Sequence, residues 1–335
     1  MIKKLMKEII NEIKSHIVFY LVLILVTPWL FIPFNYYIYM PGGLIDLTDR
    51  IEVTPEEESK GSFNLTYVSA LKGTLPNILL SYIMPNWDLD SVDNSRIENE
   101  SEKDITMRNK IFLKQTSYDA IIAAFKEANL PYEIERTELA VIHTFDYSDT
   151  KIKVGDIIKE IDGVKINNLK ELQDEIQKKE ENKKINVKVQ RDKKEVNCTS
   201  IIKKEEDRLV IGVALAELKI VKTTPKVEYI FKNSESGASR GLLCALEIYN
   251  RITEYDLTKG DIISGTGSID SEGNVGSIDG VKYKLIGAHK KGADVFIVPT
   301  DNYEEAIKIK KEKGYDIEII KADTLHNVIE ELKKR

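Results

Sequence analysis

One serine of this sequence lies between two glycines, at the point where an apolar helical pattern begins. Ser239 stands within the segment Ser236-Gly237-Ala238-Ser239-Arg240-Gly241-Leu242, and apolar residues follow it with helical spacing. A hydroxyl in this position lies at a helix N-terminus, where free backbone N–H groups can hold a developing oxyanion. Ser239 is therefore a candidate nucleophile.

A lysine downstream has the properties of a general base. The segment Gly280-Val281-Lys282-Tyr283-Lys284 opens a second predicted helix, which runs through Ala288. Helix phase places Lys284 beside the apolar stripe and rotates Lys282 away from it. A lysine forced toward a core loses hydration and its pKa falls, so that neutral amine becomes available. A serine and such a lysine form a nucleophile–base pair that needs no histidine.

Each of these residues also has a simpler structural interpretation. Ser239 is suited to be a helix N-cap, and Lys284 to be an exposed helix charge. Taken singly, either structural interpretation would be preferred. Together, with Thr266-Gly267 between them in the sequence, the two residues favour catalysis.

Residues 205–335 resemble the proteolytic domain of the Lon-type serine–lysine proteases. The resemblance rests on the Gly-x-Ser-x-Gly core, Thr266-Gly267 with its glycine-rich turn, the Gly-x-Lys-x-Lys segment and Ala288-His289. It implies that Ser239 is the nucleophile, that Lys284 is the general base and that Thr266 helps to hold the lysine amine. It implies no metal and no cofactor.

Two residues depart from the usual pattern of that family. Arg240 stands where relatives carry alanine, and Asp279 precedes Gly280 where they carry a second glycine. A cation at a helix N-terminus is unfavourable and needs a compensating partner. We therefore expect Arg240 and Asp279 to form an ion pair across the site, which would leave the electrostatics at Lys284 nearly neutral.

The N-terminal segment predicts a membrane anchor. No Asp, Glu, Lys or Arg occurs from Ser15 to Ile45, and Ile17 to Phe34 is almost wholly apolar, long enough to cross a bilayer. Lysines precede this span, so residues 1–40 are predicted to be a cytoplasmic N-terminus and a single transmembrane helix, with all later residues outside. A cleaved signal peptide is disfavoured because bulky aromatic residues follow the span. A buried helix is the other alternative. The basic flank comprises Lys3, Lys4, Lys7 and Lys14.

Residues 134–204 resemble a PDZ domain. The resemblance rests on residues 152–158, on Ile161-Asp162-Gly163-Val164, on a helix over residues 169–176 and on a strand over residues 185–189. Such domains add an extended peptide to a sheet edge and hold its terminal carboxylate in a backbone nest. No clear carboxylate-binding loop is found around Leu139 to Thr144. Peptide binding and simple packing against the protease are both open.

Residues 41–133 predict a connecting region that packs on the other domains. Phe63 to Ala70 alternates enough to be a strand, and Ser91 to Asp104 is polar enough to be an exposed loop. Asp119 to Asn129 predicts a short helix that ends before Pro131. Residues 271–274 predict a hairpin turn within the protease.

Composition limits the possible partners. The chain has 335 residues and a net charge of −6, which gives no reason to expect a nucleic-acid partner. Its two cysteines, Cys198 and Cys244, and its four scattered histidines have no metal-ligand spacing. No phosphate-cradling Gly-x-x-x-x-Gly-Lys-Ser/Thr motif occurs, so the chain has no ATP-binding loop of that kind.

The sequence thus predicts an α+β fold: a transmembrane helix, a PDZ-like β domain and a Lon-type proteolytic domain. The layout is similar to that of the membrane-anchored, PDZ-containing Lon-like proteases of bacteria. That similarity implies an ATP-independent serine endopeptidase that cleaves exposed or unfolded protein segments outside the cytoplasmic membrane, with oligomerisation left open. The alternative is a catalytically degenerate envelope adaptor that binds peptide tails through its PDZ-like domain.

Overall fold

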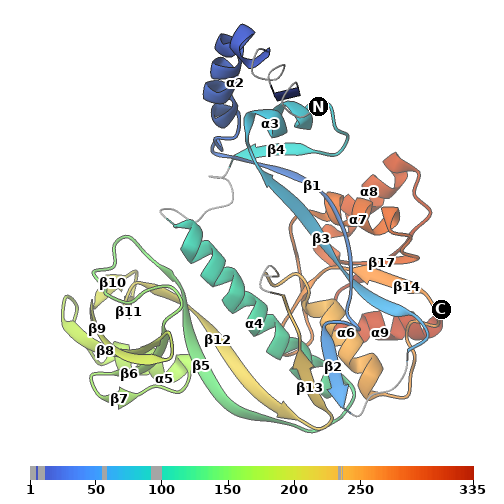
Figure 1. The fold of residues 1–335 in the computed structure, drawn as a ribbon. Helices are drawn as coiled ribbons and strands as arrows, with labels where there is room; N and C mark the ends of the chain where they lie inside the picture. Colours follow the sequence, from blue (N-terminus) through green and yellow to red (C-terminus); the bar gives the residue numbers. More distant parts are fainter. Residues whose placement is uncertain (1–4, 7–11, 55–58, 92–99, 233–234, 236) are drawn as a thin grey trace. The chain divides into compact units, whose positions relative to one another are not determined.

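A computed structural model describes residues 5–6, 12–54, 59–91, 100–232, 235 and 237–335. The chain divides into two compact units. Unit 1 comprises residues 1–41 and 68–96, and unit 2 comprises residues 42–67 and 97–335. The two long strands β1 (Tyr36–Asp46) and β3 (Ser62–Lys72) each contribute to both units (Figure 1).

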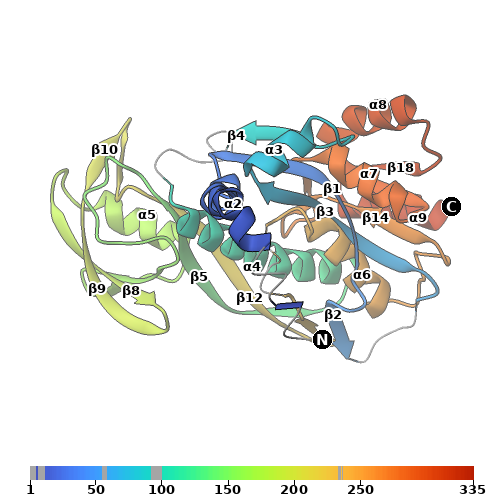
Figure 2. The ribbon, with the colours of Figure 1, turned by 45° about the horizontal axis from the view of Figure 1, so that its top comes forward.

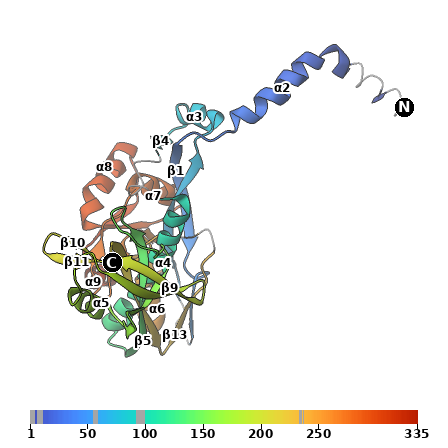
Figure 3. The same ribbon diagram turned by 90° about the vertical axis from the view of Figure 1, so that its left-hand side faces the viewer.

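Unit 1 carries an apolar helix and a small helix–strand element. Helix α2 (Ile17–Leu30) has no buried residue. Phe34 N donates to Gly73 O at 2.9 Å, which ties the chain after α2 to the start of α3 (Leu75–Ser81). Strand β4 (Asp88–Ser91) pairs antiparallel with the first residues of β1. Figure 3 shows α2 extending away from α3 and β4 of the same unit.

The predicted transmembrane helix was wrong. The helix over the apolar segment ends at Leu30, so its 14 residues rise only about 21 Å, short of the ~30 Å hydrocarbon core. Pro33 contributes to this end, because the residue before a proline is disfavoured in helical conformation. In the part of the chain that the structure describes, no helix is both long and apolar enough to cross a membrane. Lys3, Lys4 and Lys7 lie outside the described residues.

The sheet of unit 2 is mainly parallel. Its strands follow the order β18 (Glu318–Ala322), β17 (Val295–Pro299), β14 (Ile262–Gly265), β3 and β1, and β14 is parallel to both neighbours. Side chains of β17 alternate between two faces, as the strand period requires. Val295 and Ile297 pack with helices α6 (Gly241–Ile252) and α9 (Leu325–Lys334), whereas Phe296 and Val298 pack with α7 (Val281–Lys290) and α8 (Tyr303–Lys313).

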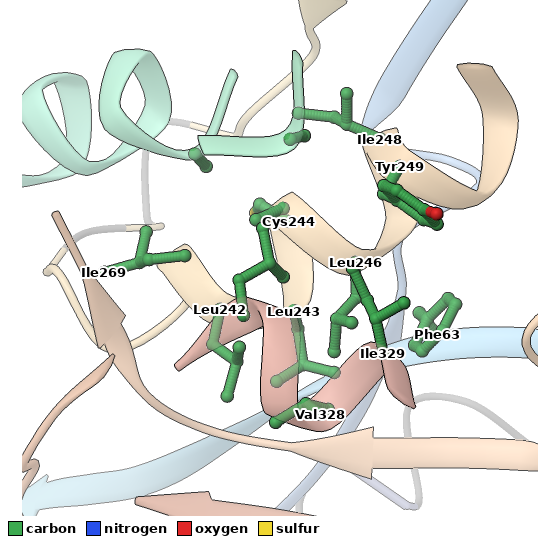
Figure 4. Packing of buried hydrophobic residues seen from close by; sticks show 14 of the residues in the cluster. Phe63, Leu242, Leu243, Cys244, Leu246, Ile248, Tyr249, Ile269, Val328 and Ile329 are labelled. Carbon is green, nitrogen blue, oxygen red and sulfur yellow. The ribbon is translucent and has the colours of Figure 1, made fainter. Parts of the chain in front are cut away.

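Helix α6 lies at the centre of the larger core. Figure 4 shows its residues Leu242, Leu243 and Leu246 among Phe63 of β3 and Val328 and Ile329 of α9. All of these side chains are fully buried. Because α6 begins directly after the candidate nucleophile, this packing holds the turn that carries Ser239.

Helix α4 (Glu102–Glu127) is much longer than the sequence predicted. The predicted loop from Ser91 to Asp104 was wrong at both ends, because Ser91 ends β4 and the helix begins at Glu102; residues 92–99 between them lie outside the described residues. Ser101 caps the helix by accepting from Asp104 N. The predicted helix from Asp119 is the second half of α4. Figure 2 shows α4 lying along β12 (Val213–Thr223) and beside α6.

A second sheet with its own core lies between α4 and α6 in the chain. Its strands follow the order β12, β5 (Tyr132–Thr144), β6 (Ile157–Ile161), β8 (Lys184–Arg191) and β9 (Lys194–Ile201), and β7 (Val164–Lys165) pairs with β6. Helix α5 (Leu169–Gln177) packs on it through Leu172 and Ile176. The long antiparallel pair β5–β12 carries the chain into and out of this part.

Short hairpins and pairs complete unit 2. The predicted hairpin at residues 271–274 is confirmed, since β15 (Ser268–Ile269) pairs antiparallel with β16 (Val275–Gly276). The predicted strand from Phe63 to Ala70 lies within β3. The remaining elements are β2 (Ile51–Thr54) paired with β13 (Lys226–Tyr229), β10 (Lys203–Glu205) paired with β11 (Arg208–Val210), and the 3-10 helix η2 (Thr300–Asn302).

Candidate active site

Ser239 lies in the turn that leads into α6. The residue at the helix N-cap is Arg240, and no side chain caps this helix end. The Ser239 hydroxyl has no hydrogen-bond partner among the described residues. The alternative in which Ser239 is merely an N-cap serine is therefore wrong. Ser236, at the start of the motif, lies outside the described residues.

The turn is fixed by its backbone. Ser239 O accepts from Gly267 N at 2.9 Å and from Thr266 Oγ1 at 3.1 Å. Leu242 N donates to Gly267 O at 3.1 Å, so the start of α6 is bonded to the residues that follow β14. Gly241 is required here, because a Cβ atom at this position would overlap Thr116 Oγ1 and the side chain of Ile269.

Lys284 is buried in the first turn and a half of α7. The helix starts after Gly280, whose left-handed φ of 76° suits a residue without Cβ. The Lys284 side chain is only 5% exposed, so the alternative of a solvated helix charge is wrong. Burial lowers the pKa of Lys284 to about 8, against the opposing effect of the Asp279 carboxylate, which favours the charged amine.

Thr266 connects the two residues. Its hydroxyl donates its single proton to Ser239 O and accepts from Lys284 Nζ at 3.1 Å. Thr266 itself is held at the end of β14, where its N–H donates to Ile297 O at 3.0 Å, and it is 1% exposed. The Thr266 hydroxyl thus bridges the Ser239 carbonyl and the Lys284 amine through two hydrogen bonds. Both Thr266 and Lys284 are shielded from most solvent.

An oxyanion donor is available in the same turn. The backbone N–H of Ser239 donates to no group among the described residues, whereas Gly241 N and Leu242 N are occupied by Ala238 O and Gly267 O. The turn also lies at the positive end of the α6 dipole. These features suit the stabilisation of negative charge beside the Ser239 hydroxyl.

The predicted ion pair between Arg240 and Asp279 was wrong. Arg240 Nη1 lies 3.1 Å from Glu235 Oε2, and Glu235 Oε1 accepts from Arg50 Nε at 2.9 Å. The Arg240 guanidinium also stacks 4.6 Å from the ring centroid of Phe231. Asp279 is exposed, whereas Arg240 is buried with its partners. The cation at the N-terminus of α6 is therefore neutralised from the segment that precedes the serine.

Among the cavities of unit 2, one borders the turn before Ser239 and another lies beside α5. One, of about 420 Å³, borders Ala238 directly before Ser239 and lies between α4 and the β15–β16 hairpin. The other, of about 560 Å³, lies between α5 and residues 205–215. In the second cavity Gln177 exchanges two hydrogen bonds with the backbone of Leu209.

The segment in which the sequence showed no clear carboxylate-binding loop is a strand. Residues 139–144 lie within β5, whereas Ile211, Gly212 and Val213 line the cavity beside α5. Gly212 has a φ of 67°, and a Cβ there would overlap Ser148. The sequence signal for this part of the cavity wall is a glycine between apolar residues, directly before the alternating strand β12.

His289 and the two cysteines lie in packed positions. His289 stacks on Tyr315 with ring centroids 3.8 Å apart. Cys198 and Cys244 are buried free thiols, and Cys244 lies on α6 in the core. Across the described residues, no group of three or more His, Cys, Asp or Glu side chains could hold a metal ion.

Two family models match this chain. Residues 141–201 match the PDZ domain, and residues 233–334 match the Lon protease (S16) C-terminal proteolytic domain. The second match contains Ser239, Thr266 and Lys284.

Curated relatives of the chain are Lon proteases. The Lon protease of Campylobacter concisus is 36% identical over 96 residues, which are 28% of this chain and 12% of that protein. The Lon protease of Aster yellows witches'-broom phytoplasma is 29% identical over 98 residues, 29% of this chain and 12% of that protein. Lon protease homolog 2, peroxisomal, of Caenorhabditis briggsae is 34% identical over 70 residues, 21% of this chain and 9% of that protein.

The matched region is thus a small part of each relative.

A solved structure of the PDZ domain of the SdrC-like protein from Listeria monocytogenes covers 23% of this chain at 20% identity, with a TM-score of 0.21. The chain is a mixed α+β protein in which a region similar to the PDZ domain is followed by a region similar to the Lon protease (S16) C-terminal proteolytic domain.

Proposed function

We propose that the protein is a serine endopeptidase with Ser239 as nucleophile and Lys284 as general base. The observation that carries this proposal is the buried Lys284 amine, which Thr266 holds two hydrogen bonds from the Ser239 backbone. A lysine with a pKa of about 8 supplies neutral amine near neutral pH. An ordinary surface lysine does not.

The chemistry follows from these positions. The Lys284 amine takes the proton of the Ser239 hydroxyl as its oxygen attacks the scissile carbonyl carbon, and the N–H of Ser239 faces the oxyanion. Lys284 then returns the proton to the leaving amine, and water hydrolyses the acyl-enzyme. Proton transfer requires the amine to approach the hydroxyl more closely than it does while bonded to Thr266, as is common in substrate-free enzymes.

The region similar to a PDZ domain supports the proposal that the substrate is an extended peptide. Strand β12 is the last strand of its sheet, and the cavity beside α5 runs along its first residues. A peptide that adds to this edge would place alternate side chains in the apolar cavity. Without an ATP-binding loop in the sequence, we propose that cleavage is ATP-independent and restricted to exposed or unfolded segments.

Membrane attachment through the apolar N-terminal segment is part of the proposal. Every side chain of α2 is at least partly exposed, and a helix that is apolar all round needs a nonpolar surrounding. Large exposed apolar residues also cluster in and after α3 of the same unit: Leu75, Leu79, Leu80, Tyr82, Ile83 and Met84. Helix α2 alone is too short to cross a bilayer, so the location of the later domains is a separate proposal, made from the lysines that precede the apolar segment: these domains lie outside the cytoplasm. Protease added to intact cells then digests residues 41–335; a fully protected chain would contradict this topology.

Hydrolysis of an unstructured protein tests the enzymatic proposal. Purified protein should cleave casein or a quenched fluorescent peptide without ATP, and Ser239→Ala and Lys284→Ala should each remove this activity while far-UV circular dichroism is unchanged. Lys282→Ala is the matched control and should remain close to wild type. Labelling by a fluorophosphonate probe should depend on Ser239. Absence of both cleavage and labelling would favour the alternative, a PDZ-bearing envelope adaptor with a degenerate protease domain.

A further inference from the structure

The cavity that borders Ala238 contains an unpaired carboxylate. Phe112, Thr116 and Asp119 repeat on α4 at a spacing of three to four residues, so they share the helix face that lines the cavity. The opposite wall is the β15–β16 hairpin, with Ile269 and Val275. Across the described residues, Asp119 has no hydrogen-bond or ion-pair partner.

The other acid of the cavity is already in use. Asp270 accepts from Glu272 N and Asn274 N, each at 2.9 Å, and from Asn274 Nδ2 at 2.8 Å. These bonds shape the hairpin and saturate most of its acceptor capacity. Asp119 is the carboxylate that remains for a ligand.

The cavity is next to the nucleophile. Thr116 Oγ1 donates to Ala238 O at 3.3 Å, so the α4 wall is bonded to the residue that precedes Ser239. In acyl transfer the carbonyl carbon of the acyl-side residue must reach the Ser239 hydroxyl. The cavity borders Ala238, one residue before the serine, so the side chain of the acyl-side residue is the substrate side chain that lies nearest to it.

The shape and chemistry of the walls favour a long cation. An apolar guest would leave the carboxylate of Asp119 desolvated and unpaired, which is costly. A lysine or arginine side chain can lay its aliphatic stem against Phe112, Ile269 and Val275 and direct its charge to Asp119. We propose that this cavity is a substrate side-chain pocket, and that Asp119 selects a basic residue on the acyl side of the scissile bond. This inference rests on the proposed endopeptidase function.

The charges that face Asp119 make the selection pH-dependent. Burial, with a smaller contribution from Asp270 of the hairpin, raises the pKa of Asp119 to about 6, while Lys219 of β12 opposes the shift. The carboxylate is therefore ionised at pH 7.5 and protonated at pH 5, where the preference for a cation is lost. Lys219, whose amine donates to Ser271 Oγ at 3.2 Å, weakens the field that a substrate cation meets.

Paired peptides that differ only in one amine test the pocket. Peptides carry lysine or its uncharged analogue norleucine on the acyl side of the scissile bond. Wild-type protein at pH 7.5 should favour lysine about fivefold or more in kcat/KM, as for a partly exposed ion pair. Asp119→Asn should reduce the ratio to within about twofold, and Lys219→Met should raise it. Asp192→Asn, at an exposed position in the β8–β9 turn, is the matched control.

Binding separates this inference from the proposed function. Fluorescence anisotropy of the same peptides on the Ser239→Ala variant measures the pocket without cleavage. Should the wild type cleave neither peptide while lysine still binds more tightly in an Asp119-dependent way, the endopeptidase proposal fails and the pocket stands. Equal use of lysine and norleucine, or an Asp119→Asn ratio like that of Asp192→Asn, overturns the pocket.

Discussion

The amine of Lys284 lies 3.1 Å from the hydroxyl of Thr266, and both side chains are almost fully buried. The threonine proton is committed to Ser239 O, so the hydroxyl presents a lone pair to the lysine. This bond limits where the buried amine can point.

Removing the Thr266 hydroxyl should therefore slow catalysis without unfolding the domain. Thr266→Val keeps the shape but loses both hydrogen bonds, and we expect kcat to fall about ten- to hundredfold. Thr266→Ser keeps the hydroxyl and should recover most of the rate. Initial-rate kinetics on a quenched peptide check this, and equal rates for Thr266→Val and wild type would contradict it.

Activity should rise with pH through the pKa of Lys284. The base must be neutral, so with a pKa of about 8 the rate at pH 7 should be about one-tenth of the alkaline plateau. Asp279→Asn removes the carboxylate that favours the charged amine, and the midpoint should move to lower pH. Asp192→Asn should leave the profile unchanged. A midpoint that moves upward in Asp279→Asn would refute this assignment.

Burial of Lys284 should also lower stability. Its pKa is about 8 when folded against 10.5 as the ordinary value, so between these pH values the unfolded state binds more protons and stability rises with pH. Below pH 8 the penalty is constant, at most about 3 kcal/mol. In a Ser239→Ala background, Lys284→Met should unfold at higher urea at pH 7, and the gain should shrink as pH rises from 8 to 10.5. A gain that grows over that range would exclude burial as the cause.

The charge network before the serine should be cooperative. Arg240→Ala leaves Glu235 with Arg50 as a partner, so we expect a loss of about 1–3 kcal/mol rather than unfolding. A double-mutant cycle with Glu235→Gln should give a coupling energy above about 0.5 kcal/mol. Urea denaturation of the four proteins measures it, and strict additivity would mean that Arg240 is held by other contacts.

The sequence predicted the positions of the two candidate residues better than the contacts around them. Ser239 and Lys284 stand where the helix pattern and glycines constrain the backbone. In the structure Lys284 is buried, and its amine donates to Thr266. The partner of Arg240 was missed because Glu235 belongs to a segment without periodicity. Ion pairs between irregular segments depend on tertiary placement, which no local pattern records.

The lengths of helix α4 and of the N-terminal apolar helix were mispredicted for different physical reasons. Helix α4 packs against both α6 and β12, so its apolar residues do not form the single stripe that identifies a helix. In residues 17–34, apolar composition predicted a continuous span, but the chain leaves the helix at Phe31. Apolar composition indicates that a segment favours a nonpolar environment. The length of its helix depends instead on residues that end helices, such as proline.

Strand β12 links two sites that the sequence keeps apart. Its residues Val213 to Leu215 line the cavity beside α5, and Lys219 further along contacts Ser271 next to the Ala238 cavity. From Leu215 to Lys219 a strand advances about 13 Å. The length of this strand therefore sets the distance between the proposed docking site and the proposed cleavage site, and an insertion or deletion within it would change that distance without changing the residues at either end.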